Sequence, residues 1–401
     1  MSESAPPPER PDAASTDPVD PPDPTLADGA DAGPVAAADP AEAASEVPSA
    51  PAADLPASGG PALSFGFNLG KIAGEGEDSD PILRDGRELG LVAVFDGMGG
   101  AGGTVYETPD GPRTGAYLAS RVARDVVEQR MVALLDPDWN LDGPATAADL
   151  QRSVRAALQE RLAELRAPAS GLRSRLLRAL PTTMAVVALQ RRERDGDRWF
   201  CHLFWAGDSR AYVFEPDGGA QQLTVDDIRD HGDAMANLRE DSVVSNAVSA
   251  DTDFVVHHRK VELTAPFLVI AATDGCFGYV PSPMHFEHLV LAALRDAPDT
   301  DSWSAALQAG VSAVTGDDAA MATLGVGADH DTFRELFARR TAELEERWIT
   351  PLDDLDADLR EHERKLDELR RARRERQAQL WAAYKPGYER YLGPATMEGT
   401  P

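Results

Sequence analysis

The sequence predicts an α+β fold built on antiparallel β-sheets, with a helical appendage near the C-terminus. The main observation is a series of three strand-like runs, 184–190, 198–206 and 210–216, joined by short turn-rich segments. Such runs are typical of antiparallel hairpins. Helical patterns lie before and after these runs instead of alternating with single strands, which argues against a doubly wound parallel sheet.

The remaining elements follow from the spacing of apolar residues. Apolar runs next to turn residues predict buried strands, and apolar residues repeating at three and four positions predict amphipathic helices. In chain order these are a strand at 89–95, helices at 113–134 and 147–166, a strand at 266–275, helices at 286–294 and 304–314, and a strand at 320–327. Residues 101–112 are expected to form a flexible surface loop, and the less regular stretch 224–260 is assigned no catalytic role.

Composition divides the chain into four parts. Residues 1–60 hold 13 of the 30 prolines, 12 acidic residues against one arginine, and no aromatic residue. Such a segment buries too little apolar surface to offset its ordering entropy, so it is expected to be a disordered tail. Residues 63–328 have the pattern of a globular domain, 333–384 are expected to form a helical hairpin or coiled coil, and 385–401 a flexible C-terminus.

Leucines repeat at heptad spacing in the third part. Thr350 and Pro351 have the residue types of a helix start. The seam that follows consists of Leu352, Leu355, Leu359, His362, Leu366 and Leu369. Two interpretations fit this pattern: a helical appendage packed on the domain, and an arm for self-association or for docking a partner.

Charge and cysteine content exclude several classes of protein. The net charge of −29 argues against nucleic acid and against an anionic membrane as the main partner. The two cysteines provide neither a disulfide framework nor a zinc-finger pattern, so a reducing, cytoplasmic location is expected. No apolar run is long enough to cross a bilayer, and the first residues lack the pattern of a secretory signal.

Carboxylates at the ends of predicted strands are the candidates for chemistry. Asp96 and Asp274 each follow an apolar strand and precede a glycine, and Asp318 stands just before another strand. Asp208, in a turn between two strands, and Asp78 add further carboxylates. A single Asp-Gly is typical of an ordinary turn. Three aspartates at strand ends instead provide oxygen ligands that suit Mg²⁺ or Mn²⁺.

Several motifs and their order resemble a known family. They are VFDGMGG at 94–100, FWAGDSRAYVF at 204–214, QLTVDD at 222–227, IAATDG at 270–275 and GDDAAMATLGV at 316–326. The chain is similar in these motifs to the metal-dependent serine/threonine protein phosphatases of type 2C, the PPM family, in its bacterial form. The resemblance covers roughly residues 65–328. It implies a sandwich of two antiparallel sheets with helices on both outer faces.

The resemblance also implies roles for individual residues. Asp96 matches the aspartate that bridges two metal ions, and Asp78 matches the acidic residue that holds metal-bound waters. The expected metal ligands are Asp96, Gly97 through its carbonyl, Asp274, Asp318 and, for a third ion at an accessory position, Asp208. The expected catalytic residues are Asp78, Asp96 and Asp274. The implied cofactors are two Mn²⁺ or Mg²⁺ ions, which activate a water for attack on phosphorus.

Three positions depart from the family pattern. Met98 replaces a histidine that many members carry, which excludes a general acid there. The arginine that grips substrate phosphate is missing, and Lys71 is the nearest cation, without the bidentate fork of arginine. The last motif has Ala319 after Asp318 in place of the common asparagine, so both Asp317 and Asp318 are candidates for the metal ligand, and the distance to the following strand favours Asp318.

The sequence therefore favours hydrolysis of phosphoserine and phosphothreonine in proteins, with a phosphorylated protein as substrate. The alternative is a catalytically weak or inactive pseudophosphatase that binds phosphoproteins as a scaffold through the helical arm at 333–384. Clustered carboxylates without a metal repel one another and cost stability, which favours the enzyme.

Overall fold

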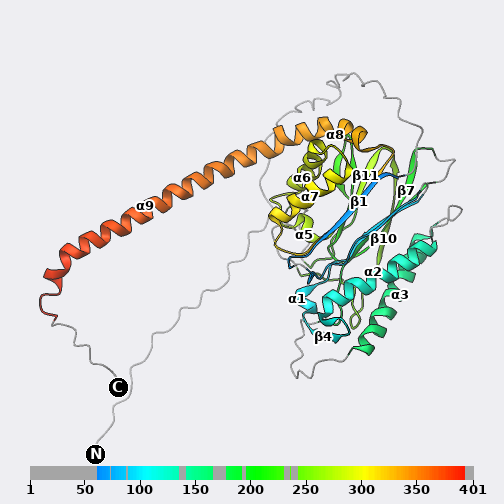
Figure 1. Cartoon of the computed structure of the whole chain (residues 1–401), viewed down its shortest axis with the longest axis horizontal. Helices are drawn as coiled ribbons and strands as arrows, with labels where there is room; N and C mark the ends of the chain where they lie inside the picture. The colour runs from blue at the N-terminus through cyan, green and yellow to red at the C-terminus, as the bar shows by residue number, and fades with distance from the viewer. Residues whose placement is uncertain are drawn as a thin grey trace, which may run out of the picture. The chain divides into compact units, whose positions relative to one another are not determined.

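The computed structural model describes residues 61–72, 74–86, 89–134, 141–165, 178–191, 196–229, 235 and 243–392 (Figure 1). The tail expected at 1–60 lies outside the described residues, as do residues 393–401 of the expected flexible C-terminus. The α+β sandwich with a C-terminal helical segment is confirmed, because two five-stranded antiparallel sheets pack together between helices.

The two sheets have the strand orders β1-β12-β11-β8-β9 and β10-β7-β6-β3-β2. The first sheet contains β1 (Pro61–Leu69), β8 (Arg210–Glu215), β9 (Gly219–Gln222), β11 (Phe267–Ala272) and β12 (Ala319–Val326). The second contains β2 (Ile82–Asp85), β3 (Leu89–Val94), β6 (Met184–Gln190), β7 (Arg198–Ala206) and β10 (His257–Thr264). A separate hairpin pairs β4 (Val105–Thr108) with β5 (Gly111–Thr114).

The helices form the outer layers (Figure 1). Helices α2 (Gly115–Leu134) and α3 (Gly143–Glu164) cover the second sheet, whereas α6 (Pro283–Asp296), α7 (Thr300–Val314) and α8 (His330–Leu344) cover the first. Two four-residue helices, α1 (Gly99–Gly102) and α5 (Asp274–Phe277), directly follow strand ends.

Alternation along the strands divides the core into layers. In β3, Leu91 and Ala93 pack under α2 and α3, whereas Val92 and Val94 point between the two sheets. This alternation is possible because successive side chains of a strand face opposite sides of its sheet. The strand is therefore apolar throughout, as expected for one buried on both faces.

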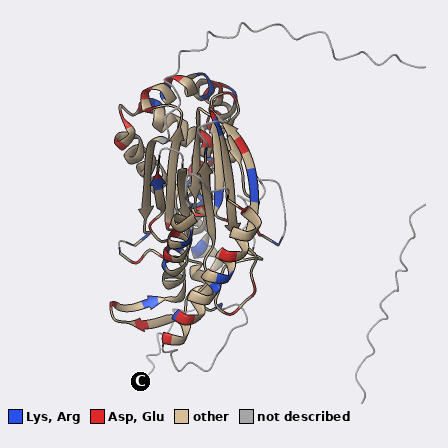
Figure 2. Ribbon diagram, turned by 90° about the vertical axis from the view of Figure 1, so that its right-hand side faces the viewer, with Lys and Arg blue, Asp and Glu red and all other residues tan. Residues whose placement is uncertain are grey.

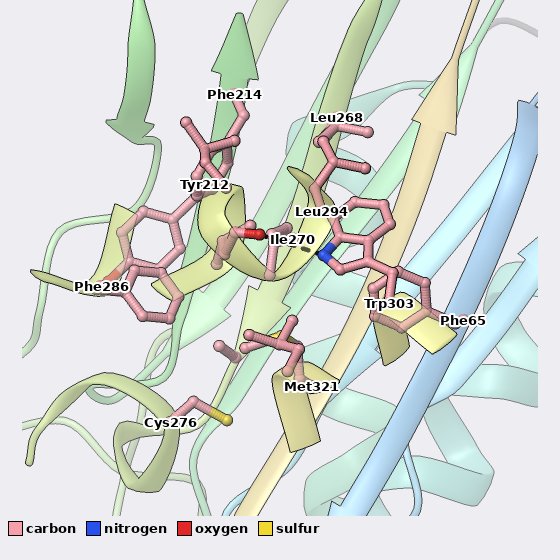
Figure 3. Close-up of a cluster of buried hydrophobic side chains, with 14 of the residues drawn as sticks. Phe65, Tyr212, Phe214, Leu268, Ile270, Cys276, Phe286, Leu294, Trp303 and Met321 are labelled. Atoms are coloured by element: carbon pink, nitrogen blue, oxygen red, sulfur yellow. Dashed lines mark hydrogen bonds between the residues drawn. The ribbon is translucent and has the colours of Figure 1, made fainter. Parts of the chain in front are cut away.

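The first sheet and its helices enclose the most aromatic part of the core (Figure 3). Trp303 of α7 is fully buried, its ring lies 4.8 Å from that of Phe65 at an edge-on angle, and its Nε1–H donates to the carbonyl of Val290 at 3.2 Å. The indole thus fills space between α7, β1 and α6 without leaving its one donor unsatisfied.

Some local expectations need correction. Residues 101–112, expected to form a surface loop, contain most of the β4–β5 hairpin. Gly111, next to its turn, has φ +102°, a conformation that favours glycine. Helix α3 starts at Gly143, four residues before the predicted start, because Asp142 caps it by accepting from the N–H of Ala145 at 3.1 Å. Within the irregular stretch, β10 adds a strand at the sheet edge.

The C-terminal helices follow one another without a reversing turn. Helix α8 continues through a π-helical turn, η2 (Glu345–Ile349), into the 39-residue helix α9 (Thr350–Tyr388). Ile349 and Thr350 keep right-handed helical angles, so Thr350 does not cap a new helix and 333–384 is not a hairpin. Pro351 has no N–H to donate, and the π-helical turn directly before it, in which the N–H of Thr350 donates to the carbonyl of Glu345, rearranges the hydrogen-bond ladder at this point. The helix also extends past residue 385, through Pro386.

Charged residues lie mainly on the outer helices and the chain connections, and the strands are largely without them (Figure 2). Edge strand β10 is an exception, with Arg259, Lys260 and Glu262, and charges of this kind discourage edge-to-edge pairing with other chains. Among the described helices, none is both long and apolar enough to cross a bilayer.

We expect Trp303→Ala to lower the free energy of unfolding by about 3–5 kcal/mol, because it opens a large cavity in the core. Urea unfolding followed by circular dichroism measures this difference. The matched control is Trp348→Ala, whose side chain is already 42% exposed and whose cost should stay within about 1 kcal/mol. Equal losses in both variants would contradict the described core.

Candidate metal-binding and catalytic site

The strand registers bring several chain segments to one end of the sandwich. In the first sheet, Leu69 pairs with Ala319 and Ala272 pairs with Arg210, so the segments next to these residues meet at the same edge. In the second sheet, Val94 pairs with Ala185, which places the end of β3 beside the start of β6. The loops that leave these strand ends carry the candidate carboxylates.

A cavity of about 480 Å³ lies at this end. Its lining includes all the acidic residues that the sequence analysis proposed for the site, together with Glu77 and residues of α1. The lining residues are Glu77, Asp78, Asp96, Gly97, Met98, Gly99, Gly100, Ala101, Asp208, Val243, Val244, Asp274, Asp317 and Asp318. None of these is a lysine or an arginine. The candidate aspartates are therefore brought together in a cavity whose described lining contains no basic side chain to balance their charge.

Burial makes the ionised form of these carboxylates costly. Burial raises the pKa of Asp78 to about 8, with the nearby charges of Asp274 and Asp318 adding to the effect. For Asp96, burial first and the charges of Asp78 and Asp274 next raise the pKa well above its ordinary value. Like charges confined in a poorly solvated space favour protonation or the binding of a cation.

A threonine network fixes Asp78. Thr273, at the end of β11, donates from Oγ1 to Oδ2 of Asp78 at 2.8 Å and accepts from the N–H of Ala320 at the same distance. Asp274 directly follows Thr273 and begins α5. One threonine thus connects the loop after β1, the end of β11 and strand β12, so it sets Asp78 relative to Asp274.

The backbone of Asp96 is held from the second sheet. Its carbonyl accepts from Oγ1 of Thr182 at 2.5 Å and from the N–H of Thr183 at 2.8 Å. Gly97 is buried, and a Cβ built there would lie 2.5 Å from the carbonyl oxygen of Glu77. Only glycine therefore fits where this segment crosses the loop after β1.

Asp318 is tied to the loop after β1 by two backbone donors. The N–H of Lys71 donates to its Oδ1 at 2.7 Å, and the N–H of Glu77 donates to its Oδ2 at 2.5 Å. Lys71 therefore belongs to the loop at the cavity, with its side chain exposed. Asp317 lies beside Asp318 in the cavity wall, and its charge raises the pKa of Asp274 after the effect of burial.

The carboxylate of Asp208 lacks a full set of hydrogen-bond partners among the described residues. Gly207 before it has φ +103°, a conformation that turns β7 into β8 and favours glycine. Oδ1 of Asp208 is buried without a hydrogen-bond partner among the described residues, and burial raises the pKa of this carboxyl to about 7. The neighbouring Arg210 does not neutralise it, because its guanidinium makes a buried bidentate pair with Asp226.

Glu77 is the one cavity carboxylate to which the sequence analysis assigned no role. Its Oε1 accepts from Oγ1 of Thr114 at 2.6 Å, at the end of the β4–β5 hairpin. Its carbonyl accepts from Ser120 at 2.5 Å and from Arg121 at 3.2 Å, both on α2. The Glu-Asp pair at 77–78, ahead of strand β3, is the signal in the sequence that could have pointed to Glu77. The contacts of Glu77 with α2 and with the β4–β5 hairpin leave no signal in the sequence.

The residues of the cavity fit a hard divalent cation. All the side-chain donors are carboxylate oxygens, the described lining holds no histidine or cysteine, and one buried oxygen of Asp208 has no partner. Within the described residues, no three such side chains already form a compact metal-binding group. The cavity thus has the donor types for such ions, with carboxylates partly engaged by protein donors such as those on Asp318.

In EDTA, we expect Asp208→Asn to be more stable than the wild type at pH 8, by at least ~1 kcal/mol. The folded protein raises the pKa of Asp208 to about 7, above its value in the unfolded chain. The protonated carboxyl therefore stabilises the fold fully at pH values below the unfolded-state pKa, and this stabilisation is lost as pH rises through about 7. The advantage of the variant should therefore grow between pH 4 and pH 8. Thermal unfolding across this range measures it, with Asp217→Asn, whose side chain is 96% exposed, as the control. A pH-independent difference would contradict this electrostatic account.

Comparison with solved structures finds similar folds at low sequence identity. The serine/threonine phosphatase PstP/Ppp of Mycobacterium tuberculosis matches at 18% identity and TM-score 0.45, over 66% of this chain and 97% of that chain. The PPM phosphatase MsPP of Mycobacterium smegmatis matches at 14% identity and TM-score 0.43, over 66% and 98%. A C. elegans sex determining protein matches at 16% identity and TM-score 0.49, over 69% and 67%.

Comparison with curated proteins found no match. The family of the chain is assigned from its match to a protein-family model. The model of protein phosphatase 2C matches residues 78–327, which is more than half of the 401 residues and spans the chain from Asp78 to the end of β12. On this match the chain belongs to the protein phosphatase 2C family.

Proposed function

We propose that this protein hydrolyses phosphoserine and phosphothreonine in proteins, with Mn²⁺ or Mg²⁺ bound in the carboxylate cavity. The observation that carries the proposal is the gathering of Asp78, Asp96, Asp208 and Asp274 in one cavity. In a member of the protein phosphatase 2C family, such a cavity is best explained as a site for cations and a phosphoryl group.

Asp96, the carbonyl of Gly97, Asp274 and Asp318 would hold two ions, and Asp208 would serve an accessory third. Bound divalent ions supply Lewis acidity, which lowers the pKa of a water and neutralises charge on a phosphoryl group. The unpartnered Oδ1 of Asp208 supports its inclusion, since a buried carboxylate oxygen without a donor is costly.

Asp78 would act as the group that orients water and accepts its proton. The Thr273 hydroxyl fixes Oδ2 of Asp78, which sets the carboxylate plane beside Asp274. Without cations, burial raises the pKa of Asp78 to about 8, so this carboxyl can accept a proton from water near neutral pH only when bound cations favour its ionised form. Glu77, held by Thr114 from the hairpin, would support the same face of the cavity.

Lys71 would contact the phosphate of the substrate from the loop after β1. Its backbone N–H bonds to Asp318, so its exposed side chain starts at the cavity wall. A single ammonium provides a point charge and not the bidentate contact of an arginine. The described cavity lining contains no lysine or arginine, which is the observation that favours a weak or inactive pseudophosphatase as the second candidate.

We expect Asp274→Asn and Asp96→Asn each to lower Mn²⁺-dependent phosphate release from a phosphothreonine peptide by at least ~100-fold, because each removes an anionic ligand. Asp217→Asn, on an exposed residue away from the cavity, is the control and should retain activity. Calorimetric titration with Mn²⁺ should show weaker binding in the two cavity variants. A wild type that binds Mn²⁺ but releases no phosphate would support the pseudophosphatase.

The pair Asp317→Asn and Asp318→Asn separates the two candidate ligands in the last motif. We expect the Asp318 variant to lose more Mn²⁺ affinity, because its carboxylate is fixed by two backbone donors at the cavity. Calorimetry on both variants at the same pH measures the difference. A larger loss in the Asp317 variant would move the assignment to Asp317.

For Lys71→Ala, we expect a rise in KM of about 3–10-fold with a smaller change in kcat, since an exposed ammonium contributes modestly to substrate binding. Lys260→Ala, on edge strand β10, is the matched control for the loss of one exposed charge. Initial rates over a range of phosphopeptide concentrations separate KM from kcat. Equal effects of the two variants would remove Lys71 from the substrate site.

A further inference from the structure

Helix α9 presents a long apolar seam that the described part of the chain does not cover. None of its 39 residues is buried. Its leucines are 38–68% exposed, including Leu355 at 61%, Leu359 at 61% and Leu369 at 68%. The residues that follow heptad spacing are Leu352, Leu355, Leu359, His362, Leu366, Leu369, Arg373, Arg376, Leu380 and Ala383. A seam of this kind normally packs against another helix.

The charges of α9 are divided between its two halves. Residues 350–369 contain eight acidic and three basic residues, a net charge of −5. Residues 370–388 contain one acidic and six basic residues, a net charge of +5. A solvated helix face has no need of such separation, and alternating charges would give it more support within the helix. The charges of two copies of α9 are therefore complementary when the helices run in opposite directions.

We propose that α9 is a self-association arm that pairs with α9 of a second copy of this chain as an antiparallel coiled coil. Antiparallel pairing places the half with net charge −5 against the half with net charge +5. Parallel pairing in register would place like charges side by side, which opposes association. The proposal is independent of the phosphatase activity.

The heptad spacing gives a specific register. Setting Leu366 of one copy against Leu369 of the other also brings Leu355 opposite Leu380. The two-fold axis then passes between residues 367 and 368, next to the 369–370 boundary at which the charge changes sign. The paired region spans residues 350–385, about five heptads, which exceeds the three to four that sustain a coiled coil.

Two arginines at seam positions are accommodated in this register. Arg373 falls opposite His362, and Arg376 falls opposite Leu359. Their aliphatic stems pack along the seam while the guanidinium groups reach the acidic half of the partner helix. Each such contact exists only in the antiparallel orientation, since the parallel one would bring the arginines of the two copies together.

Multi-angle light scattering on the full chain at tens of micromolar tests association. We expect about twice the 42.9 kDa chain mass, and dissociation as salt is raised. The double variant Leu366→Asp, Leu369→Asp should raise the dissociation constant at least about tenfold. Ala357→Asp, on the opposite face of the helix, is the control and should remain dimeric. Circular dichroism establishes that the variants fold. A wild-type monomer throughout this range, or a control that dissociates equally, would overturn the proposal.

Disulfide trapping tests the orientation. The two native cysteines, Cys201 and Cys276, are buried, so introduced cysteines dominate cross-linking. Mixing a Leu355→Cys chain with a Leu380→Cys chain under mild oxidation should give the mixed disulfide-linked dimer, with little cross-linking in either chain alone. Efficient cross-linking of Leu355→Cys with itself would show the parallel orientation and overturn the antiparallel arrangement.

Discussion

Buried negative charge is the constraint on which the described site depends. Two antiparallel sheets pack so that the ends of β3, β7, β11 and the start of β12 meet, and an aspartate follows or precedes each of these ends. Burial raises the pKa of Asp78, Asp208 and Asp274, with neighbouring carboxylates contributing. A fold that keeps such a cluster gives up stability unless cations or protons offset the repulsion. That cost is the physical reason to propose a metal-dependent function.

The fold counters this repulsion with neutral donors and not with ion pairs. Thr273 holds Asp78, two backbone N–H groups hold Asp318, and Thr182 and Thr183 hold the backbone of Asp96. These donors fix positions without cancelling charge, so the carboxylates stay available to a cation. The buried guanidinium of Arg210 pairs with Asp226. At Asp208, burial raises the pKa most, the charge of Asp226 adds to this effect, and the charge of Arg210 opposes it without cancelling it.

The sequence was most informative where a signal is local. An apolar strand followed by Asp-Gly predicted Asp96 and Asp274 at strand ends, because both strand burial and turn chemistry are encoded within about ten residues. The contact of Thr273 with Asp78 could not be predicted from pattern alone, since 195 positions separate the two residues. The β4–β5 hairpin has a turn signal in the sequence, Pro-Asp-Gly before Pro112, but turn residues of this kind occur in surface loops as well as in hairpins.

In the C-terminal segment, the sequence pattern predicted the helix but not the direction in which the chain continues. Heptad leucines predicted α9 correctly as a helix, but the proline at 351 suggested a break where the chain continues through a π-helical turn. The π-helical turn before this proline shifts the hydrogen-bond ladder by one residue, so the missing N–H does not end the helical path. The sequence therefore identified the apolar seam of α9, while the direction of the helix required its backbone angles.

Anomalous diffraction from crystals of the full chain grown with Mn²⁺ tests the central claim most directly. Two strong manganese peaks are expected in the cavity, where Asp96 and Asp274 would hold the ions. An empty cavity at millimolar Mn²⁺, or peaks only at exposed carboxylates elsewhere, would contradict a two-metal site.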